Sequence, residues 1–227
     1  MTRGLSLRNL SMAIAGRPLL AIEALEVAPG EIVTLMGPSG SGKSSLIAFL
    51  CGALDPAFEA RGEVVLNGRP LAGLPLEQRR IGVLYQDDLL FAHLSVAENL
   101  AFAVPQRAPR AERRRRVEAA LQEAELEGFG PRDPATLSGG QKARVALMRA
   151  LLAEPEALLL DEPFSKLDAA LRARVRDFTF ATIRRRGLPA ILVTHDHEDN
   201  AGRALLLSEG RLEPLPVTNI RAGLPLA

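Results

Sequence analysis

Continuous apolar runs stand out along the chain and predict the strands of a buried sheet. The runs are Ile32–Met36, Ile81–Tyr85, Ala157–Leu160 and Ala190–Thr194. Strands that are apolar without alternation are typical of a parallel sheet covered on both faces. A last strand of this core is expected at Ala204–Leu207.

More mixed segments predict a second, antiparallel sheet. They are Leu5–Leu10, Leu19–Val27 and Glu63–Leu66, and Asn67-Gly68 after the last of them is a strong hairpin signal.

From Gln86 to Pro155 the pattern turns helical, with no convincing strand. The stretch Arg113–Glu127 is typical of an amphipathic helix, because Val117, Leu121 and Ala124 recur on one face. The run of four arginines from Arg113 to Arg116 could contact phosphates or a partner. Flanking glutamates favour a solvated helix face instead.

Size and composition favour one domain. With 227 residues and 47% hydrophobic content, the chain can bury one good core. We expect a single α/β domain over 1–227, with a core of 1–86 and 156–227 and an inserted helical subdomain of 87–155.

Charge and cysteine content restrict the chemistry. A formal net charge of +1 provides no field that favours nucleic acid or anionic lipid. No apolar run approaches the roughly 18 residues of a membrane span, and the N-terminus lacks a signal-peptide pattern, so we expect a cytosolic chain. Because Cys51 is the only cysteine of the sequence, no intramolecular disulfide is possible. We expect Cys51 to pack in the core as a small apolar side chain.

The segment 37–44 satisfies every fixed position of the P-loop pattern G-x-x-x-x-G-K-[ST]. It follows an apolar strand, and Ser44–Cys51 after it reads as a helix, so backbone N–H groups and the positive helix end converge on one concavity. We expect this loop to bind a polyphosphate, with Lys43 toward the β- and γ-phosphates and the Ser44 hydroxyl on Mg²⁺. The phosphate-binding candidates are Gly37, Pro38, Ser39, Gly40, Ser41, Gly42, Lys43, Ser44 and Ser45.

Polar residues follow three other predicted strands. Gln86, Asp161 and His195 fall at or just after strand ends, where ligands of parallel sheets bind. A carboxylate at the end of an apolar strand is costly without compensation, so a metal-linked role is favoured for Asp161. An imidazole at position 195 can donate to a phosphate oxygen, although a lone histidine is also compatible with a structural role.

Two further motifs complete a family pattern. Leu137-Ser138-Gly139-Gly140-Gln141 precedes Leu158-Leu159-Leu160, which leads into Asp161-Glu162-Pro163. With the P-loop, these motifs resemble the ATP-binding cassette (ABC) family over essentially the whole chain. The resemblance implies a P-loop NTPase fold with a RecA-like parallel-sheet core, an antiparallel β subdomain and a helical subdomain, and it implies ATP and Mg²⁺ as cofactors.

The resemblance also assigns catalytic and metal-binding roles. Asp161 matches the carboxylate that binds Mg²⁺, and Glu162 matches the general base that polarises the attacking water. Gln86 matches a glutamine that contacts Mg²⁺ and relays changes to the helical subdomain, and His195 matches the switch histidine.

In this family two cassettes pair head to tail. Ser138 and Gln141 have the spacing of a helix capping box before Lys142–Ala153, yet the N–H groups behind them form a second anion site. The resemblance implies that Ser138, Gly139, Gly140 and Gln141 cap the nucleotide of a second copy, and that Asp168 crosses the dimer interface. Ile14 occupies the place where the family usually has an aromatic residue that stacks on adenine.

The chain is most similar to importer cassettes of the spermidine, ferric-iron, sulfate and thiamine group, and its segments 86–100 and 133–136 resemble an uncharacterised enterobacterial cassette. We therefore expect the ATPase subunit of a bacterial importer, a homodimer peripheral to the cytoplasmic face of the inner membrane. Its expected partners are an integral-membrane permease, docked around Asp87–Asn99, and an extracytoplasmic substrate-binding protein, with no nucleic acid. An exporter or lipoprotein-release ATPase is the leading alternative. A soluble cassette acting on ribosomes or DNA is the other, although those members carry two cassettes or long coiled coils.

Overall fold

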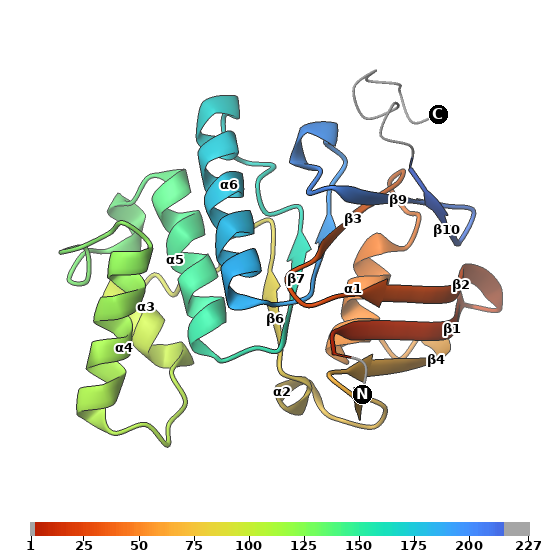
Figure 1. Ribbon diagram of the computed structural model, residues 1–227, viewed down its shortest axis with the longest axis horizontal. Helices are drawn as coiled ribbons and strands as arrows, with labels where there is room; N and C mark the ends of the chain where they lie inside the picture. Colours follow the sequence, from red (N-terminus) through yellow and green to blue (C-terminus); the bar gives the residue numbers. More distant parts are fainter. Residues whose placement is uncertain (1–2, 216–227) are drawn as a thin grey trace. The chain divides into compact units, whose positions relative to one another are not determined.

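The computed structural model describes residues 3–215 and divides into two compact units (Figure 1). Unit 1 takes its described residues from the ranges Met1–Ile81, Glu156–Glu162 and Phe180–Ala227. Unit 2 comprises Gly82–Pro155 and Pro163–Thr179. The segment 87–155, expected as a helical subdomain, lies inside unit 2, and the expected boundaries themselves stay a prediction.

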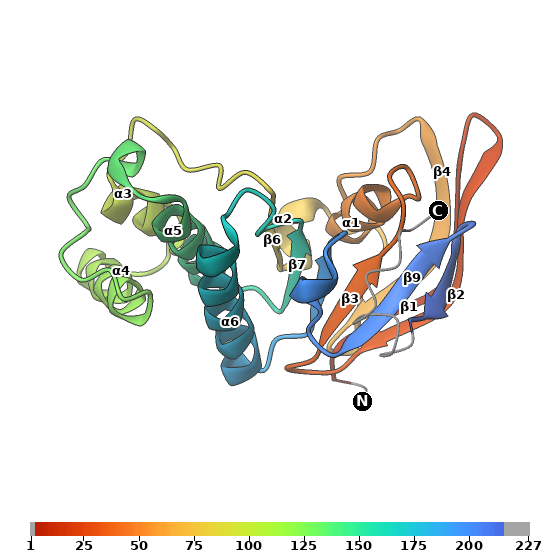
Figure 2. The ribbon, with the colours of Figure 1, turned by 90° about the horizontal axis from the view of Figure 1, so that it is seen from above.

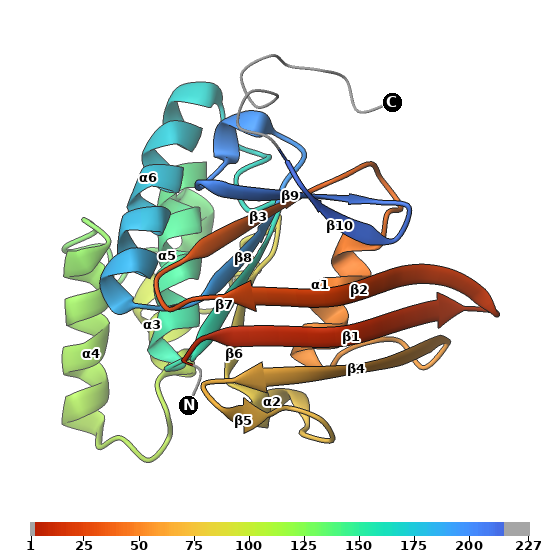
Figure 3. The same ribbon diagram turned by 45° about the vertical axis from the view of Figure 1, so that its right-hand side comes forward.

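An antiparallel sheet in unit 1 has the strand order β2-β1-β4-β5 (Figure 3). Its strands are β1 (Leu5–Ile14), β2 (Arg17–Val27), β4 (Phe58–Leu66) and β5 (Arg69–Pro70). The β4–β5 hairpin turns at Asn67 and Gly68, both with positive φ, as the sequence predicts. β4 begins five residues before the predicted Glu63, because its first less exposed positions, Phe58, Ala60 and Gly62, are only partly buried and two of them are small, which weakens the alternating apolar signal.

The second sheet has the order β10-β9-β3-β8-β7-β6. Its strands are β3 (Ile32–Met36), β6 (Ile81–Leu84), β7 (Ala157–Asp161), β8 (Ala190–Val193), β9 (Arg203–Ser208) and β10 (Arg211–Pro214). β3 is parallel to both β8 and β9, and β7 is parallel to β8, which confirms the parallel core. Every residue of β3 and β8 is buried, as expected for strands without alternation.

Two helices of unit 1 follow strands of these sheets. α1 (Lys43–Cys51) comes directly after the glycine-rich loop, and α2 (Leu76–Arg79) precedes β6. Cys51 is 4% exposed, which confirms the packed role expected for it. Burial raises the pKa of its thiol to about 11, so the side chain is uncharged at neutral pH.

Helices make up most of unit 2 (Figure 2). They are α3 (Val96–Ala103), α4 (Arg110–Glu123) and α5 (Gly139–Leu152), with a short 3₁₀ helix at Pro134–Thr136. α3 packs against both α4 and α5. Val117, Leu121 and Ala124 are all buried, which confirms the predicted apolar face of α4 and its C-terminal extension.

Unit 2 also contains the start of a long helix that the sequence pattern did not predict. α6 (Ala169–Arg186) passes from unit 2 into unit 1 at Phe180. Its buried residues include Val175, Thr179 and Ile183. The polar threonine among them, and the many arginines of the helix, weaken the periodic apolar pattern by which a helix is predicted. A second 3₁₀ helix, His197–Asp199, follows β8.

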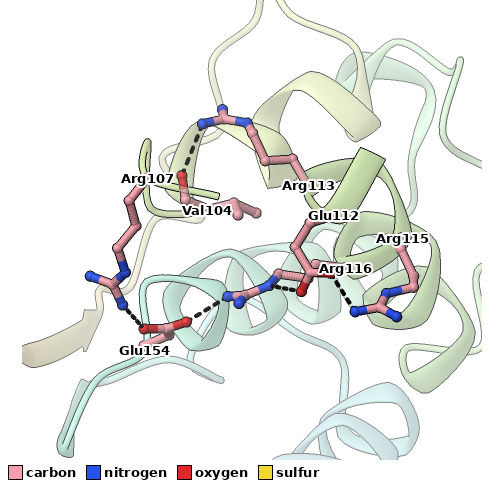
Figure 4. Close-up of polar contacts among 7 residues, drawn as sticks. All are labelled: Val104, Arg107, Glu112, Arg113, Arg115, Arg116 and Glu154. Atoms are coloured by element: carbon pink, nitrogen blue, oxygen red, sulfur yellow. Dashed lines mark hydrogen bonds and ion pairs between the residues drawn. The ribbon is translucent and has the colours of Figure 1, made fainter. Parts of the chain in front are cut away.

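The arginine run of α4 is neutralised locally (Figure 4). Arg115 and Arg116 both pair with Glu112, and Arg114 pairs with Glu118. Arg116 also pairs with Glu154, which Arg107 contacts at 2.7 Å. These contacts confirm that the run is a helix face with its own counter-charges.

No helix within residues 3–215 is both long and apolar enough to cross a lipid bilayer.

Candidate functional site

Strand pairing brings three sequence motifs of unit 1 to one edge of the sheet. Val193 of β8 is in register with Leu35 of β3 on one side and with Asp161 of β7 on the other. Beyond this level, the Glu162 N–H donates to Val193 O at 2.9 Å and the Thr194 N–H to Leu35 O at 3.2 Å. The residues that follow the three strands therefore leave the sheet side by side, as expected for ligand-binding ends of parallel strands.

The glycine-rich loop after β3 needs its glycines for close packing. A Cβ at position 37 would lie 2.4 Å from the carbonyl oxygen of Leu207, and one at position 42 would lie 2.8 Å from Leu20 Cδ2. Gly42 is also the N-cap of α1 with φ 98, a left-handed conformation that a side chain disfavours. Pro38, Ser39, Gly40 and Ser44 are exposed, so the rim of the loop is accessible to a ligand.

The Lys43 ammonium lies inside this loop. It donates to Gly37 O and Pro38 O, each at 2.8 Å, and contacts Ser41 Oγ at 3.4 Å. Burial lowers the pKa of Lys43, and the carboxylates of Glu162 and Asp161 partly offset this shift. A buried ammonium enclosed by a glycine-rich loop with an exposed rim suits recognition of a polyphosphate.

Asp161, the last residue of β7, lies beside the first turn of α1. The Ser44 hydroxyl donates to its carboxylate, and Lys43 attracts it, yet burial and the neighbouring Glu162 raise its pKa overall. A carboxylate that is only partly compensated and shares an edge with a hydroxyl fits Mg²⁺, which prefers oxygen ligands and keeps several waters. Within residues 3–215, no three histidine, cysteine or acidic side chains group to hold a metal.

Glu162 and His195 meet at the same edge. Glu162 Oε1 lies 3.3 Å from His195 Nδ1, with side-chain exposures of 30% and 62%. The backbone of Glu162 has φ 49, an uncommon conformation for a residue with a side chain. The pair thus presents a carboxylate and an imidazole to solvent near the glycine-rich loop 37–44.

A hydrogen-bonded network behind His195 was not predicted from the sequence. Thr194 Oγ1 donates to Asp199 Oδ2 at 3.1 Å and accepts from the Asp196 N–H at 3.1 Å. Asp199 is 1% exposed. This network fixes the turn that carries His195. The only sequence signal for this network is the run of polar residues 194–200 after β8, because such runs are typical of Asx and Ser/Thr turns.

The remaining candidates belong to unit 2, apart from Ile14. Gln86 is exposed, two residues after β6 ends. Ser138 and Gln141 form the predicted capping box: Gln141 Oε1 accepts from the Ser138 N–H at 2.9 Å, and Ser138 Oγ from the Gln141 N–H at 3.4 Å. Asp168 accepts from the Leu171 N–H at 3.0 Å, as a helix N-cap does.

The two glycines of the capping-box helix have a packing role that the sequence did not reveal. A Cβ on Gly140 would lie 2.5 Å from Leu171 Cδ1, and one on Gly139 would lie 3.1 Å from Leu167 Cδ2. These leucines flank Asp168, so the start of α5 and the segment around Asp168 are packed together within unit 2. Ser138 and Gly139 remain exposed.

Ile14 lies at the end of β1 in unit 1. It pairs with Arg17 of β2 and Phe58 of β4, and it is 38% exposed. An apolar side chain is therefore available to solvent there, and its role as a base contact stays a prediction.

The raised pKa of Asp161 predicts an effect on stability. A carboxyl whose pKa is higher in the folded chain contributes stability at low pH, and this contribution is lost as the pH rises through the folded pKa. Asp161→Asn removes the charge but keeps an acceptor for Ser44. At neutral pH, without metal, we expect a rise in Tm of roughly 2–4 °C, the shift that about 1 kcal/mol produces in a domain of this size.

Calorimetry in EDTA checks this prediction. The gain should be smaller at acidic pH than at neutral pH, because the wild-type carboxyl takes up its proton as the pH falls through its raised pKa. Asp55→Asn, at an exposed aspartate of the same unit that accepts from the Ala57 N–H, should change Tm less. An equal gain at both pH values would show that the charge of Asp161 is not the cause.

Comparisons with known proteins agree with this arrangement. The ABC transporter family model matches residues 22–165. An uncharacterized ABC transporter ATP-binding protein of Escherichia coli K12, YnjD, is 50% identical over 195 residues, which cover 86% of this chain and 90% of that protein.

Two import ATP-binding proteins are also similar. The sulfate/thiosulfate protein CysA of Caulobacter vibrioides is 40% identical, and the match covers 93% of this chain and 64% of CysA. The spermidine/putrescine protein PotA of Oleidesulfovibrio alaskensis is 40% identical, with coverage of 84% and 52%. The chain thus spans about half to two thirds of the length of these two relatives. With its P-loop, strand-end carboxylates and signature motif, the chain belongs to the ABC transporter family and is an ATP-binding, ATP-hydrolysing subunit, similar to proteins named for import.

Proposed function

We propose that this chain drives solute import by coupling ATP hydrolysis, in a head-to-tail homodimer, to movement of a membrane permease. The observation that carries the proposal is the grouping of Lys43, Asp161 and Glu162 at one edge of the parallel sheet. Phosphoryl transfer to water needs a phosphate cradle, charge neutralisation and an oriented nucleophile. Each need has a candidate at this edge.

Each residue of this edge has a proposed role in ATP binding or hydrolysis. The loop Gly37–Ser45 and the Lys43 ammonium hold the phosphates, while Glu162 polarises the attacking water and His195 donates to the γ-phosphate. Bound Mg²⁺ would neutralise charge on the β- and γ-phosphate oxygens. The Ser44 hydroxyl and the Asp161 carboxylate would hold it.

The second anion site argues for a dimer. The α5 N-terminus exposes Ser138 and Gly139, although the P-loop of the same chain already provides a complete cradle. We infer that Ser138 to Gln141 cap the nucleotide of a second copy and that Asp168 faces that interface. The packing of Gly140 against Leu171 supports a shared surface, because it holds both segments in one body.

A groove in unit 2 supports the permease as a partner. It has a volume of about 530 Å³ and is mostly apolar, with the exposed side chains Tyr85, Leu89 and Phe102 on its lining. An exposed apolar hollow of this kind is typical of a helix-docking site. We infer that it receives a helix of the permease, and we propose that the chain works at the cytoplasmic face of the inner membrane.

The names of the relatives support import as the direction of transport. Those named for a substrate are import proteins, which favours import with an extracytoplasmic substrate-binding protein over an exporter or lipoprotein-release ATPase. The transported solute contacts the permease and the binding protein rather than this chain.

Glu162→Gln tests the catalytic assignment. The amide keeps the shape of the side chain but cannot take up a proton, so steady-state ATP hydrolysis should fall by about 10²–10⁴-fold while ATP still binds. A stable ATP-bound dimer should accumulate in gel filtration with ATP and Mg²⁺. Unchanged turnover would remove Glu162 from the role of base.

A mixture of two inactive variants tests the shared site. Lys43→Ala disables the P-loop and Ser138→Arg disables the signature, so a heterodimer contains one composite site with both lesions and one with neither. Hydrolysis should reappear in the mixture above the level of each variant alone. Full activity of Ser138→Arg by itself, or no recovery in a mixture proven to contain heterodimers, would contradict independent head-to-tail sites.

Ile14→Tyr tests the base contact. An aromatic contact contributes about 0.5–1.5 kcal/mol beyond area burial, so ATP should bind roughly 2- to 10-fold more tightly, and GTP should compete well with ATP in the wild type. Fluorescence titration with both nucleotides measures this. Leu89→Tyr, which adds an aromatic ring at an exposed leucine of unit 2, should leave the affinity unchanged. No gain from Ile14→Tyr would place the base elsewhere.

A further inference from the structure

The C-terminal end of α1 is held by an arginine from another segment of unit 1. Arg79 Nη1 donates to the carbonyl oxygens of Phe49 and Leu50, both at 2.9 Å. The last carbonyls of a helix lack partners within the helix and form the negative end of its dipole. The guanidinium therefore gives Leu50 O a partner, adds a second hydrogen bond to Phe49 O, which already accepts from the Gly52 N–H at 3.1 Å, and complements the dipole.

The guanidinium is oriented before it reaches the helix. Arg79 Nε donates to Leu74 O at 3.0 Å, which fixes the plane of the group. The backbone of α2 is itself held by Arg69, which donates to Gln78 O at 2.8 Å and Arg79 O at 3.2 Å. Arg79 is thus a rigid fork, and lysine could not reproduce its geometry.

Gly52 provides the space for this contact. A Cβ at position 52 would lie 2.5 Å from Arg79 Nε and 2.7 Å from Cζ. The residue is the C-cap of α1 with φ 79, so a side chain there is disfavoured for its backbone conformation as well. Glycine after α1 both ends the helix and lets the guanidinium approach its last carbonyls.

α1 is short enough for this end to affect the other. Its nine residues span about 14 Å, and its first turn carries Lys43 and Ser44. Hydrogen bonds make such a helix a stiff rod, so a change in how its C-terminus is held tilts or shifts the first turn. Small displacements of groups that contact a ligand are costly in binding.

We propose that Arg79 is a positioning residue for nucleotide binding, which acts through α1 by holding Lys43 and Ser44 at the place where they meet the phosphates. The hydrogen bonds that the Arg79 guanidinium donates go to Leu74, Phe49 and Leu50, not to the loop Gly37–Ser41. Its effect is on affinity for the phosphates, and a purely structural role would reduce only the amount of folded protein.

The test is calorimetric titration of Arg79→Met with Mg·ADP, and separately with magnesium pyrophosphate, which lacks the base and ribose. Methionine keeps an unbranched side chain but removes every donor. Both ligands should bind about tenfold more weakly, a change of 1.4 kcal/mol, with one site per chain retained. The affinity of Arg79→Lys for both ligands should lie between that of Arg79→Met and that of the wild type.

Arg113→Met is the matched control. Arg113 holds the end of α3 in the same manner, since it donates to Val104 O at 3.3 Å (Figure 4) and to Ala101 O at 2.8 Å, but α3 carries no phosphate-binding residue. This variant should lose a similar amount of thermal stability while its affinity for both ligands stays within twofold of the wild type.

Three outcomes would overturn the proposal. They are unchanged affinity with a reduced number of binding sites in Arg79→Met, an equal loss of affinity in Arg113→Met, and weaker Mg·ADP binding with unchanged pyrophosphate binding. If Arg79→Met does not fold, Gly52→Ala provides the same test. Its added methyl group would displace the Arg79 guanidinium from the end of α1, so the affinity for both ligands should fall in the same way.

Discussion

The register of the parallel sheet is the constraint on which the site depends. Val193 is bonded between Leu35 and Asp161, so the heights of three strand ends are set by one ladder of backbone hydrogen bonds. A slip of one residue in β8 would move His195 by about 3.3 Å along the strand and turn its side chain to the other face. The buried apolar side chains of β3 and β8 prevent this slip, because each fits a position enclosed on both faces. A core without any catalytic side chain thereby fixes the distance between Glu162 and His195.

The sequence predicts most closely the strands in which burial is complete on both faces. β3, β7 and β8 lie where uninterrupted apolar runs occur, and the capping box of α5 could be read from Ser138 and Gln141. The prediction is incomplete where burial is partial. The start of β4 is only partly buried and includes the small residues Ala60 and Gly62, β5 and β10 are short, and α6 carries arginines among the residues of its buried face. Tertiary contacts determine these elements, and the local pattern does not record such contacts.

For the site, residue identity was predictable but local environment was not. The motifs give Lys43, Asp161 and Glu162 directly. They do not reveal that the Ser44 hydroxyl donates to Asp161 or that Asp199 is buried behind the turn that carries His195. Arg79 was not predicted either, because an arginine in a short exposed helix has the same sequence signal whether its guanidinium is solvated or holds another helix. Long-range side chain to backbone hydrogen bonds leave no periodic trace in a sequence.

The contact between Gly140 and Leu171 has a consequence for how the family's sequences can vary. The two residues lie in different motifs, about thirty positions apart, yet a Cβ on the first would occupy the space of the second. A larger residue at position 140 is compatible with this packing only if residue 171 becomes smaller or the segment around Asp168 moves. We therefore expect the residues at these two positions to covary, because the volume of either side chain limits which residues fit at the other position.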